Sequence, residues 1–167
     1  TFDEAVARFQ EAETLLRDRV VTSDDVDPRH AKQLAVTRSL LAGVFQELDR
    51  ETESIRALEA TIVSLEALVQ LVPSEVDFHV DHARAMVNMG HLGYQLEDSS
   101  AAEIHVEKGR EILVRLHEST DSDRYIEDIA AAQLMLGLIK LDLGSDKLVP
   151  AGDLLQGAVN LFEQLPR

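Results

Sequence analysis

The chain has 167 residues, of which 45% are hydrophobic and 28% charged, with a net charge of −15 and no cysteine. This length is enough for one domain with a real core, and the lack of cysteine excludes disulfides, thiolate metal ligands and a cysteine nucleophile. The negative charge argues against nucleic acid or an anionic membrane surface as a partner, and the longest nearly apolar run, 129–139, is too short to span a bilayer.

Apolar residues recur every three or four positions along the chain, which predicts helices, and no alternating pattern typical of strands persists. A first helix is expected near 2–19. Turn-forming residues then separate helical segments at 22–29, 72–77, 97–100 and 118–124. A last helix is expected near 148–165. The sequence therefore predicts an all-α fold of about seven helices with no sheet.

Three stretches align without gaps, and they begin 48 and 47 residues apart, at Gln33, Asp81 and Asp128. Each has a large apolar residue followed by a small one, in the pairs Leu41-Ala42, Met89-Gly90 and Leu136-Gly137. Small residues let antiparallel helices approach closely. We therefore expect contact with a neighbouring helix to offset the propensity cost of Gly90. Gly93 lies outside this column, and no packing role is predicted for it.

A second set of four stretches has a small residue, a large apolar residue four positions later, and a small residue three positions after that. Its members are Ala5-Phe9-Ala12, Ser54-Leu58-Thr61, Ala102-Val106-Gly109 and Ala151-Leu155-Ala158. Together the two sets describe a repeating pair of helices. The period of about 48 residues is typical of a repeat architecture.

These columns resemble the tetratricopeptide repeat (TPR), most clearly in "ARAMVNMGHLGYQLEDSSAAEIHVEKG". The long period is similar to that of TPR arrays attached to bacterial Ser/Thr kinases and other multidomain signalling proteins. The resemblance implies a single repeat domain over 1–167, in which antiparallel helix hairpins form a right-handed superhelix. Its units would cover about 1–30 (partial), 31–77, 78–124 and 125–167.

The chain opens on threonine rather than methionine, so we expect it to be a piece of a longer protein. No signal peptide is recognisable, and a cytoplasmic location is expected. A solenoid needs polar capping elements at its ends. Neither end is expected to have one, because each has apolar residues that require cover: Val6 and Phe9 at the first, and Leu155, Leu161 and Phe162 at the second.

In the TPR family, the first helix of each unit lines a concave groove that receives an extended or helical peptide. Carried over by position, the resemblance implies groove residues in three units. They are Ser39, Gly43 and Gln46 in the first, Arg84, Val87, Asn88, His91, Tyr94 and Gln95 in the second, and Leu134, Leu138 and Leu141 in the third. The third first-type helix is apolar nearly all round, which implies burial on both faces. A partner peptide, a second copy or another part of the parent protein could cover it.

The segment 75–82, "EVDFHVDH", is the best candidate for metal chemistry. His79 and His82, three residues apart on a helix, could share a divalent ion. There is no third histidine nearby, and acidic residues are expected at a helix start, so we predict neither a functional metal site nor a cofactor. No nucleophile, phosphate-binding loop or acid–base pair is recognisable, and an enzyme is not predicted.

The expected function is that of a non-catalytic protein–protein interaction module, a scaffolding or regulatory part of a multidomain signalling protein. The segment that it binds should be basic or amphipathic, given the charge. Two alternatives stay open. One is self-association as a homodimer, or docking onto another domain of the same protein. The other is an all-α metal-binding protein that uses 75–82.

Overall fold

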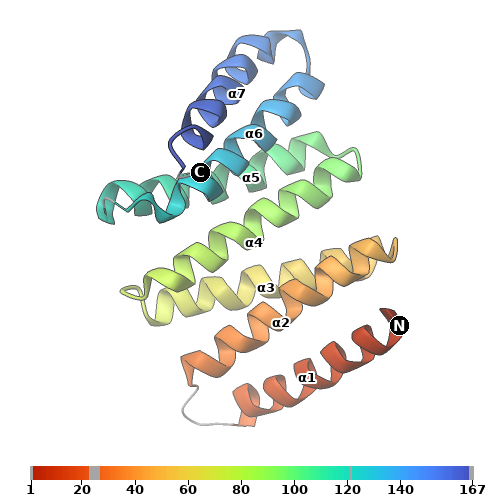
Figure 1. The fold of residues 1–167 in the computed structure, drawn as a ribbon. Coiled ribbons are helices and arrows are strands. Elements are labelled where there is room, and N and C mark those ends of the chain that lie inside the picture. The colour runs from red at the N-terminus through yellow and green to blue at the C-terminus, as the bar shows by residue number, and fades with distance from the viewer. Residues whose placement is uncertain (1, 23–26, 121, 166–167) are drawn as a thin grey trace. The chain divides into compact units, whose positions relative to one another are not determined.

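The computed structural model describes residues 2–22, 27–120 and 122–165. The described residues form seven α-helices and two short 3-10 turns, with no strand among them (Figure 1). The elements are α1 (Phe2–Thr22), α2 (Pro28–Glu47), α3 (Glu51–Leu71), α4 (Val76–Gln95), α5 (Ser99–Thr120), η1 (Asp123–Tyr125), α6 (Ile126–Leu143), η2 (Ser145–Lys147) and α7 (Leu148–Phe162). The prediction of an all-α fold is confirmed.

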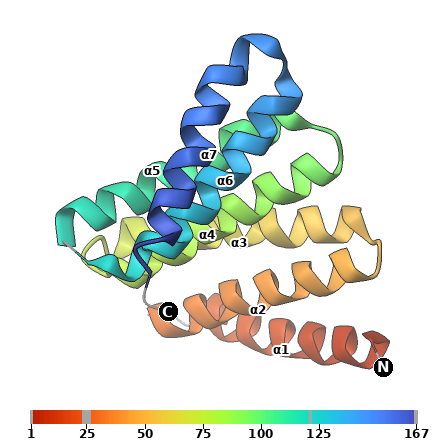
Figure 2. The same cartoon turned by 45° about the horizontal axis from the view of Figure 1, so that its top comes forward.

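The chain divides into two compact units, residues 1–85 and 86–167. The first contains α1, α2, α3 and the N-terminal half of α4, and the second contains the rest of α4 with α5, α6 and α7. Figure 2 shows the α6–α7 hairpin of the second unit from another direction. The predicted division into repeat units is not tested by this boundary and stays a prediction.

Helices α2, α4 and α6 are each followed by a residue with positive φ: Asp49 (54°), Glu97 (62°) and Gly144 (127°). These residues lie 48 and 47 positions apart, the same spacing as the three aligned stretches. The breaks at 48–50 and 144–147 were not among the four predicted turns. The break at 48–50 depends on one left-handed residue, Asp49, and composition gives little signal there. The break at 144–147 does contain the turn formers Gly144, Ser145 and Asp146, and this signal was overlooked.

Replacing Glu97 with glycine is expected to raise the free energy of unfolding by about 0.5–1 kcal/mol. Glycine adopts the left-handed conformation without a Cβ penalty. The turn itself is held by the Asp98 N–H, which donates to the Gly93 carbonyl at 2.9 Å. Urea unfolding measures the change. The control, Arg115→Gly at an exposed position inside α5, should lose about 1 kcal/mol; a loss in both variants would contradict the prediction.

In the first unit, α1 is covered by α2. Val6 is buried in a cluster with Leu41 and Phe45, and Phe9 packs against it. Helix α2 thus supplies cover that Val6 and Phe9 were expected to require. The side of α1 that faces away is largely polar, and its exposed residues include Glu4, Arg8, Glu11 and Asp18. Periodicity identifies the apolar face of α1, but only the tertiary structure shows that α2 packs on it.

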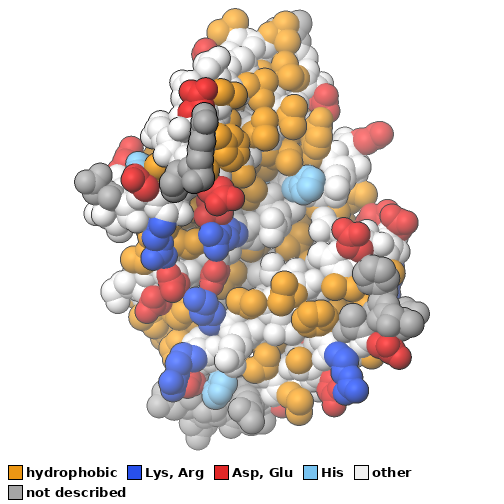
Figure 3. All heavy atoms as spheres, viewed as in Figure 1, with side chains coloured by type: hydrophobic (Ala, Val, Ile, Leu, Met, Phe, Trp, Pro, Cys, Tyr) orange, Lys and Arg blue, Asp and Glu red, His pale blue; other side chains and the backbone are white. Residues whose placement is uncertain are grey.

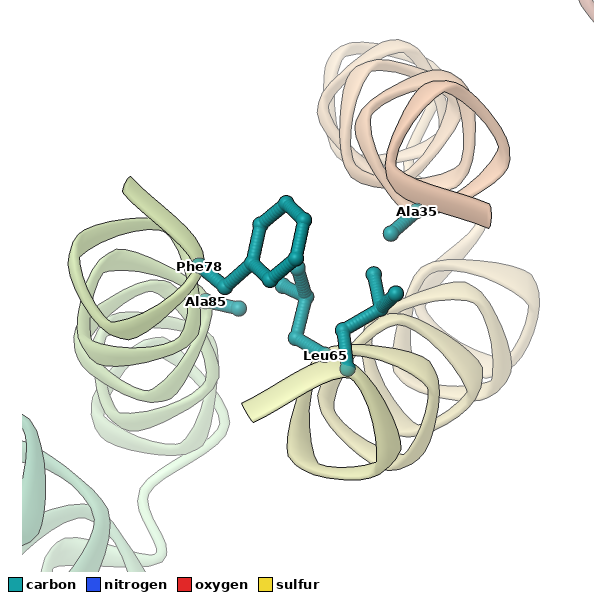
Figure 4. Close-up of a cluster of buried hydrophobic side chains, with 5 residues drawn as sticks. Ala35, Leu65, Phe78 and Ala85 are labelled. Carbon is teal, nitrogen blue, oxygen red and sulfur yellow. The ribbon is translucent and has the colours of Figure 1, made fainter. Parts of the chain in front are cut away.

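A second cluster in the first unit joins α2, α3 and α4. Its buried members are Ala35, Leu65, Leu68, Phe78 and Ala85. Figure 4 shows Phe78 and Ala85 of α4 pointing toward the space between α2 and α3. The N-terminal half of helix α4 thus closes over the α2–α3 hairpin, with the Phe78 ring in the shared cluster.

Gly90 lies where α4 meets α5. A Cβ added to Gly90 would lie 2.3 Å from Val106 Cγ2 and 2.9 Å from the Ala102 carbonyl oxygen. The prediction that a close helix contact requires Gly90 is confirmed. A Cβ on Gly93 would lie 3.6 Å from Ala102, which is ordinary van der Waals contact. The packing therefore does not require a glycine at position 93.

The other helix hairpins meet through small residues as well. In the first unit, the Ser54 hydroxyl of α3 donates to the Ala42 carbonyl of α2 at 3.0 Å. In the second, a Cβ on Gly137 of α6 would lie 2.6 Å from Leu155 Cγ of α7. At Gly90, Ser54 and Gly137 the small residues are therefore sites of close approach between helices, as predicted.

Candidate binding surface

Three exposed leucines follow one side of α6. Leu134, Leu138 and Leu141 are 41%, 38% and 41% exposed, and spacings of four and three residues place them on one helix face. Ala132 and Leu136, on another side of α6, are fully buried in the core. This side of α6 is therefore open in the single chain, and the expectation that a partner peptide, a second copy or another part of the protein covers it stays a prediction. We call these three residues the leucine stripe. Figure 3 shows hydrophobic side chains gathered over α6 and α7.

Tyr94 of α4 lies beside the leucine stripe. Its hydroxyl donates a hydrogen bond to the Asp142 carboxylate, and this bond raises the pKa of Tyr94 above its usual value. Asp142 follows Leu138 by one helical turn and so lies on the same side of α6. The half-buried ring of Tyr94 packs against the core cluster of α5 and α6, as does Val87. A hydrogen-bonded polar pair, Tyr94 and Asp142, therefore borders the leucine stripe.

The structure places the other predicted groove residues as follows. Asn88, His91 and Gln95 are exposed on the part of α4 that belongs to the second unit. Arg84 is exposed but belongs to the first unit, so it is not described together with α6. In α2, Ser39, Gly43 and Gln46 are half-buried. The assignment of all these residues to a binding groove stays a prediction.

The surface around the leucine stripe has acidic but few basic groups. Residues 86–95 of α4 include no lysine or arginine, and α6 has one, Lys140. Lys140 forms an ion pair with Glu103 of α5, which leaves the exposed carboxylate of Asp142 as the charged group beside the stripe. Sequence reasoning missed both the Tyr94–Asp142 bond and this ion pair. The available signal was an aspartate one turn after Leu138, at the polar edge of the apolar stripe.

Cavities of about 240 and 310 Å³ lie in the first unit. The smaller one lies between α1, α2 and α3, and Arg38 is one of its lining residues. The Arg38 guanidinium donates hydrogen bonds to Glu13 at 2.9 Å and to Ser64 at 3.0 Å. The larger one is mainly apolar and is lined by Ala31, Leu34, Val63, Ser64, Ala67, Leu68 and Leu71. Neither lining brings together a nucleophile and a general base.

The histidines considered for metal binding lie one turn apart on α4. His79 Nε2 lies 2.9 Å from the Pro73 carbonyl oxygen, within hydrogen-bond distance. His82 is buried, and its Nε2 has no hydrogen-bond partner. Among the described residues, no group of three or more His, Cys, Asp or Glu side chains could hold a metal ion. The structure thus adds no third ligand to this pair.

His82 should make stability depend on pH. Burial lowers the pKa of His82 below its usual value of 6.5, while the charge of Glu66 acts in the opposite direction. The unfolded chain therefore takes up the proton more readily, so the stability conferred by neutral His82 is present above pH 6.5 and is lost as the pH falls through 6.5 toward the folded-state pKa.

We expect the free-energy difference between wild type and His82→Gln, which cannot titrate, to shrink between neutral pH and about pH 5. Urea unfolding at several pH values measures this difference directly. Using the difference cancels the titration of the other acidic and basic groups. A difference independent of pH would show that the pKa of His82 is the same in the folded and unfolded chains.

The sequence matches no known family model, and no curated protein is similar to it. Among solved structures, the chain is similar to the crystal structure of BtubC (BKLC) from P. vanneervenii, with a TM-score of 0.57 and 18% sequence identity. The match covers 96% of this chain and 58% of that chain, so this chain spans little more than half of BtubC. At this identity the likeness concerns the fold alone. None of the described helices has the length and apolar character needed to cross a membrane.

Proposed function

We propose that the chain is a non-catalytic protein–protein interaction module of the TPR-like kind, which scaffolds or regulates within a multidomain signalling protein. Its α4–α6 side binds a basic or amphipathic segment of another protein. The observation that carries the proposal is the exposed leucine stripe beside the carboxylate of Asp142. Contiguous exposed apolar side chains bordered by polar groups are typical of a protein-binding surface.

The geometry favours a helical partner. The first and last residues of the leucine stripe, Leu134 and Leu141, are seven positions apart, about 10 Å along the helix axis. An amphipathic helix that presents apolar residues three, four and seven positions apart matches this length. Lysine or arginine beside those residues would pair with Asp142. Because α6 is already ordered, only the partner loses conformational freedom, and a dissociation constant on the order of 1 μM is expected for a short peptide.

A set of synthetic amphipathic peptides tests this proposal. They share the same apolar residues and differ only in the sign of their net charge. Fluorescence anisotropy should show that the positive peptide binds most tightly and that added salt weakens its binding. Leu138→Lys should abolish binding. The matched control is Ile104→Lys, which replaces an exposed apolar residue of α5 in the same unit; unchanged affinity in Leu138→Lys would show that the leucine stripe is not the site.

A further inference from the structure

The C-terminal half of α7 exposes apolar residues whose counterparts in α3 are covered. The column Ser54-Leu58-Thr61 of α3 recurs 97 residues later as Ala151-Leu155-Ala158 of α7. The same offset pairs Ile62 with Val159 and Leu65 with Phe162. Leu65 is 2% exposed, whereas Val159 and Phe162 are 50% and 40% exposed. The face of α7 that includes Val159 and Phe162, here called the α7 face, therefore lacks the cover that α3 has.

The part of α4 that covers α3 does so with an aromatic residue and an alanine at a fixed spacing. Phe78 and Ala85, seven residues apart on α4, close over Leu65 (Figure 4). The same pattern recurs 47 residues later as Tyr125 and Ala132, which are 2% and 0% exposed. Ala132 packs against α5, which is the counterpart of α3 in the second unit. An aromatic residue followed after seven positions by an alanine thus occurs twice where a helix closes over its neighbour.

The charge at the edge of this surface indicates which charge the partner helix should carry. In the first unit, Lys32 Nζ of α2 lies 3.3 Å from Asp81 Oδ2 and 3.8 Å from Asp77 Oδ2. Asp77 precedes Phe78 by one residue, and Asp81 follows it by three. The aligned stretches place Glu127 of α6, which is exposed, at the position of Lys32. A helix seated on the α7 face would therefore need cations where α4 has its two aspartates.

Glu127 and Phe162 lie at the same end of the α6–α7 hairpin. Gly137 is next to Leu155, and a Cβ on Gly157 would lie 3.0 Å from Gln133 Oε1. Lower numbers on α6 thus face higher numbers on α7, so the helices are antiparallel. Within α7 the only charged residue is an aspartate, and the exposed residue that follows the helix is a glutamate. Helix α7 and the residue after it therefore contribute acidic but no basic groups near Phe162.

We propose that the α7 face, together with Glu127, seats one amphipathic helix of a partner protein. In that helix a basic residue comes directly before an aromatic residue. A second basic residue follows the aromatic residue by three positions, and an alanine follows it by seven. This surface is separate from the leucine stripe and does not depend on the proposed function. The aromatic side chain would pack on Val159 and Phe162, as Phe78 packs on Leu65. The two cations would pair with Glu127, in the reverse of the contact that Lys32 makes.

Peptides derived from α4 of the same chain can test this proposal. One synthetic peptide has the sequence of α4, residues 76–95, and a second carries Asp77→Lys and Asp81→Lys. Fluorescence anisotropy with the full chain should show about tenfold tighter binding of the lysine peptide. Glu127→Lys should reverse this preference. Phe162→Asp should abolish binding, whereas Val149→Asp, which introduces the same charge at an exposed position near the start of α7, should not.

Equal affinity for both peptides, or affinity unaffected by Phe162→Asp, would overturn the proposal. Binding that persists in Phe162→Asp would instead indicate exchange with the chain's own α4. Light scattering decides whether a second copy occupies the surface: a dimer that Phe162→Asp converts to a monomer also contradicts the proposal. Leu138→Lys should leave the lysine peptide bound, so this result and the test of the leucine stripe can fail independently.

Discussion

Gly90→Ala is expected to lower the free energy of unfolding by about 1–3 kcal/mol, whereas Gly93→Ala should leave it unchanged or raise it by up to about 1 kcal/mol. Both substitutions add one methyl group to α4, three residues apart, so their effects on helix propensity are similar. The difference comes from the contact with α5. At Gly90 the new Cβ would lie 2.9 Å from the Ala102 carbonyl oxygen, and backbone cannot yield without a shift of the helix.

Urea unfolding of the two variants measures this difference, and the double variant Gly90→Ala/Val106→Ala separates its two causes. Removing the Val106 side chain relieves the 2.3 Å contact with its Cγ2 but not the contact with the Ala102 carbonyl. Because Val106 is itself buried, its loss should add a cost of its own. If Gly90→Ala and Gly93→Ala changed the stability equally, α4 would not approach α5 most closely at Gly90.

Tyr125→Ala should have the largest effect of any single substitution considered, a loss of about 3–5 kcal/mol in the free energy of unfolding. The ring is 2% exposed and is the largest fully buried side chain among the described residues. Removing it opens a cavity where η1 packs against α5 and α6. The Arg124 guanidinium also lies 4.8 Å from the ring centroid, and this cation–π contact would be lost.

Tyr125→Phe is the matched control and should cost less than about 1.5 kcal/mol, because it keeps the ring and the contact with Arg124. Thermal or urea unfolding distinguishes the two variants readily. Comparable losses in both would show that the hydroxyl group, rather than the ring, stabilises this end of α6. The outcome also bears on the α7 face, because Tyr125, the last residue of η1 before α6, has the place in the pattern that the partner's aromatic residue would have.

The helices and their close contacts could be predicted because they depend on local spacing. Apolar residues every three or four positions define a helix face, and a small residue such as Gly90 marks where another backbone approaches. The turn at Asp49 was missed, because a single left-handed residue between Leu48 and Arg50 leaves almost no compositional trace. The helix that covers Val6 was not predicted either, since periodicity identifies an apolar face without identifying what packs on it.

The candidate site likewise has one part that the sequence predicted and one part that it did not. The leucine stripe follows from the spacing of Leu134, Leu138 and Leu141 alone, and its role in binding stays a prediction. The hydrogen bond between Tyr94 and Asp142 does not follow, because these residues are 48 positions apart and meet only once α4 packs beside α6.

The sequence by itself determined the helical class and the positions of close helix approach at Gly90 and Gly137, since each follows from a local pattern of apolar and small residues. Tertiary structure alone decided which apolar faces are covered and which charges are paired. Val6 is covered and Phe162 is not, although both are apolar residues on terminal helices. Whether a side chain is buried depends on a helix that is distant in sequence, and local periodicity carries no information about that helix.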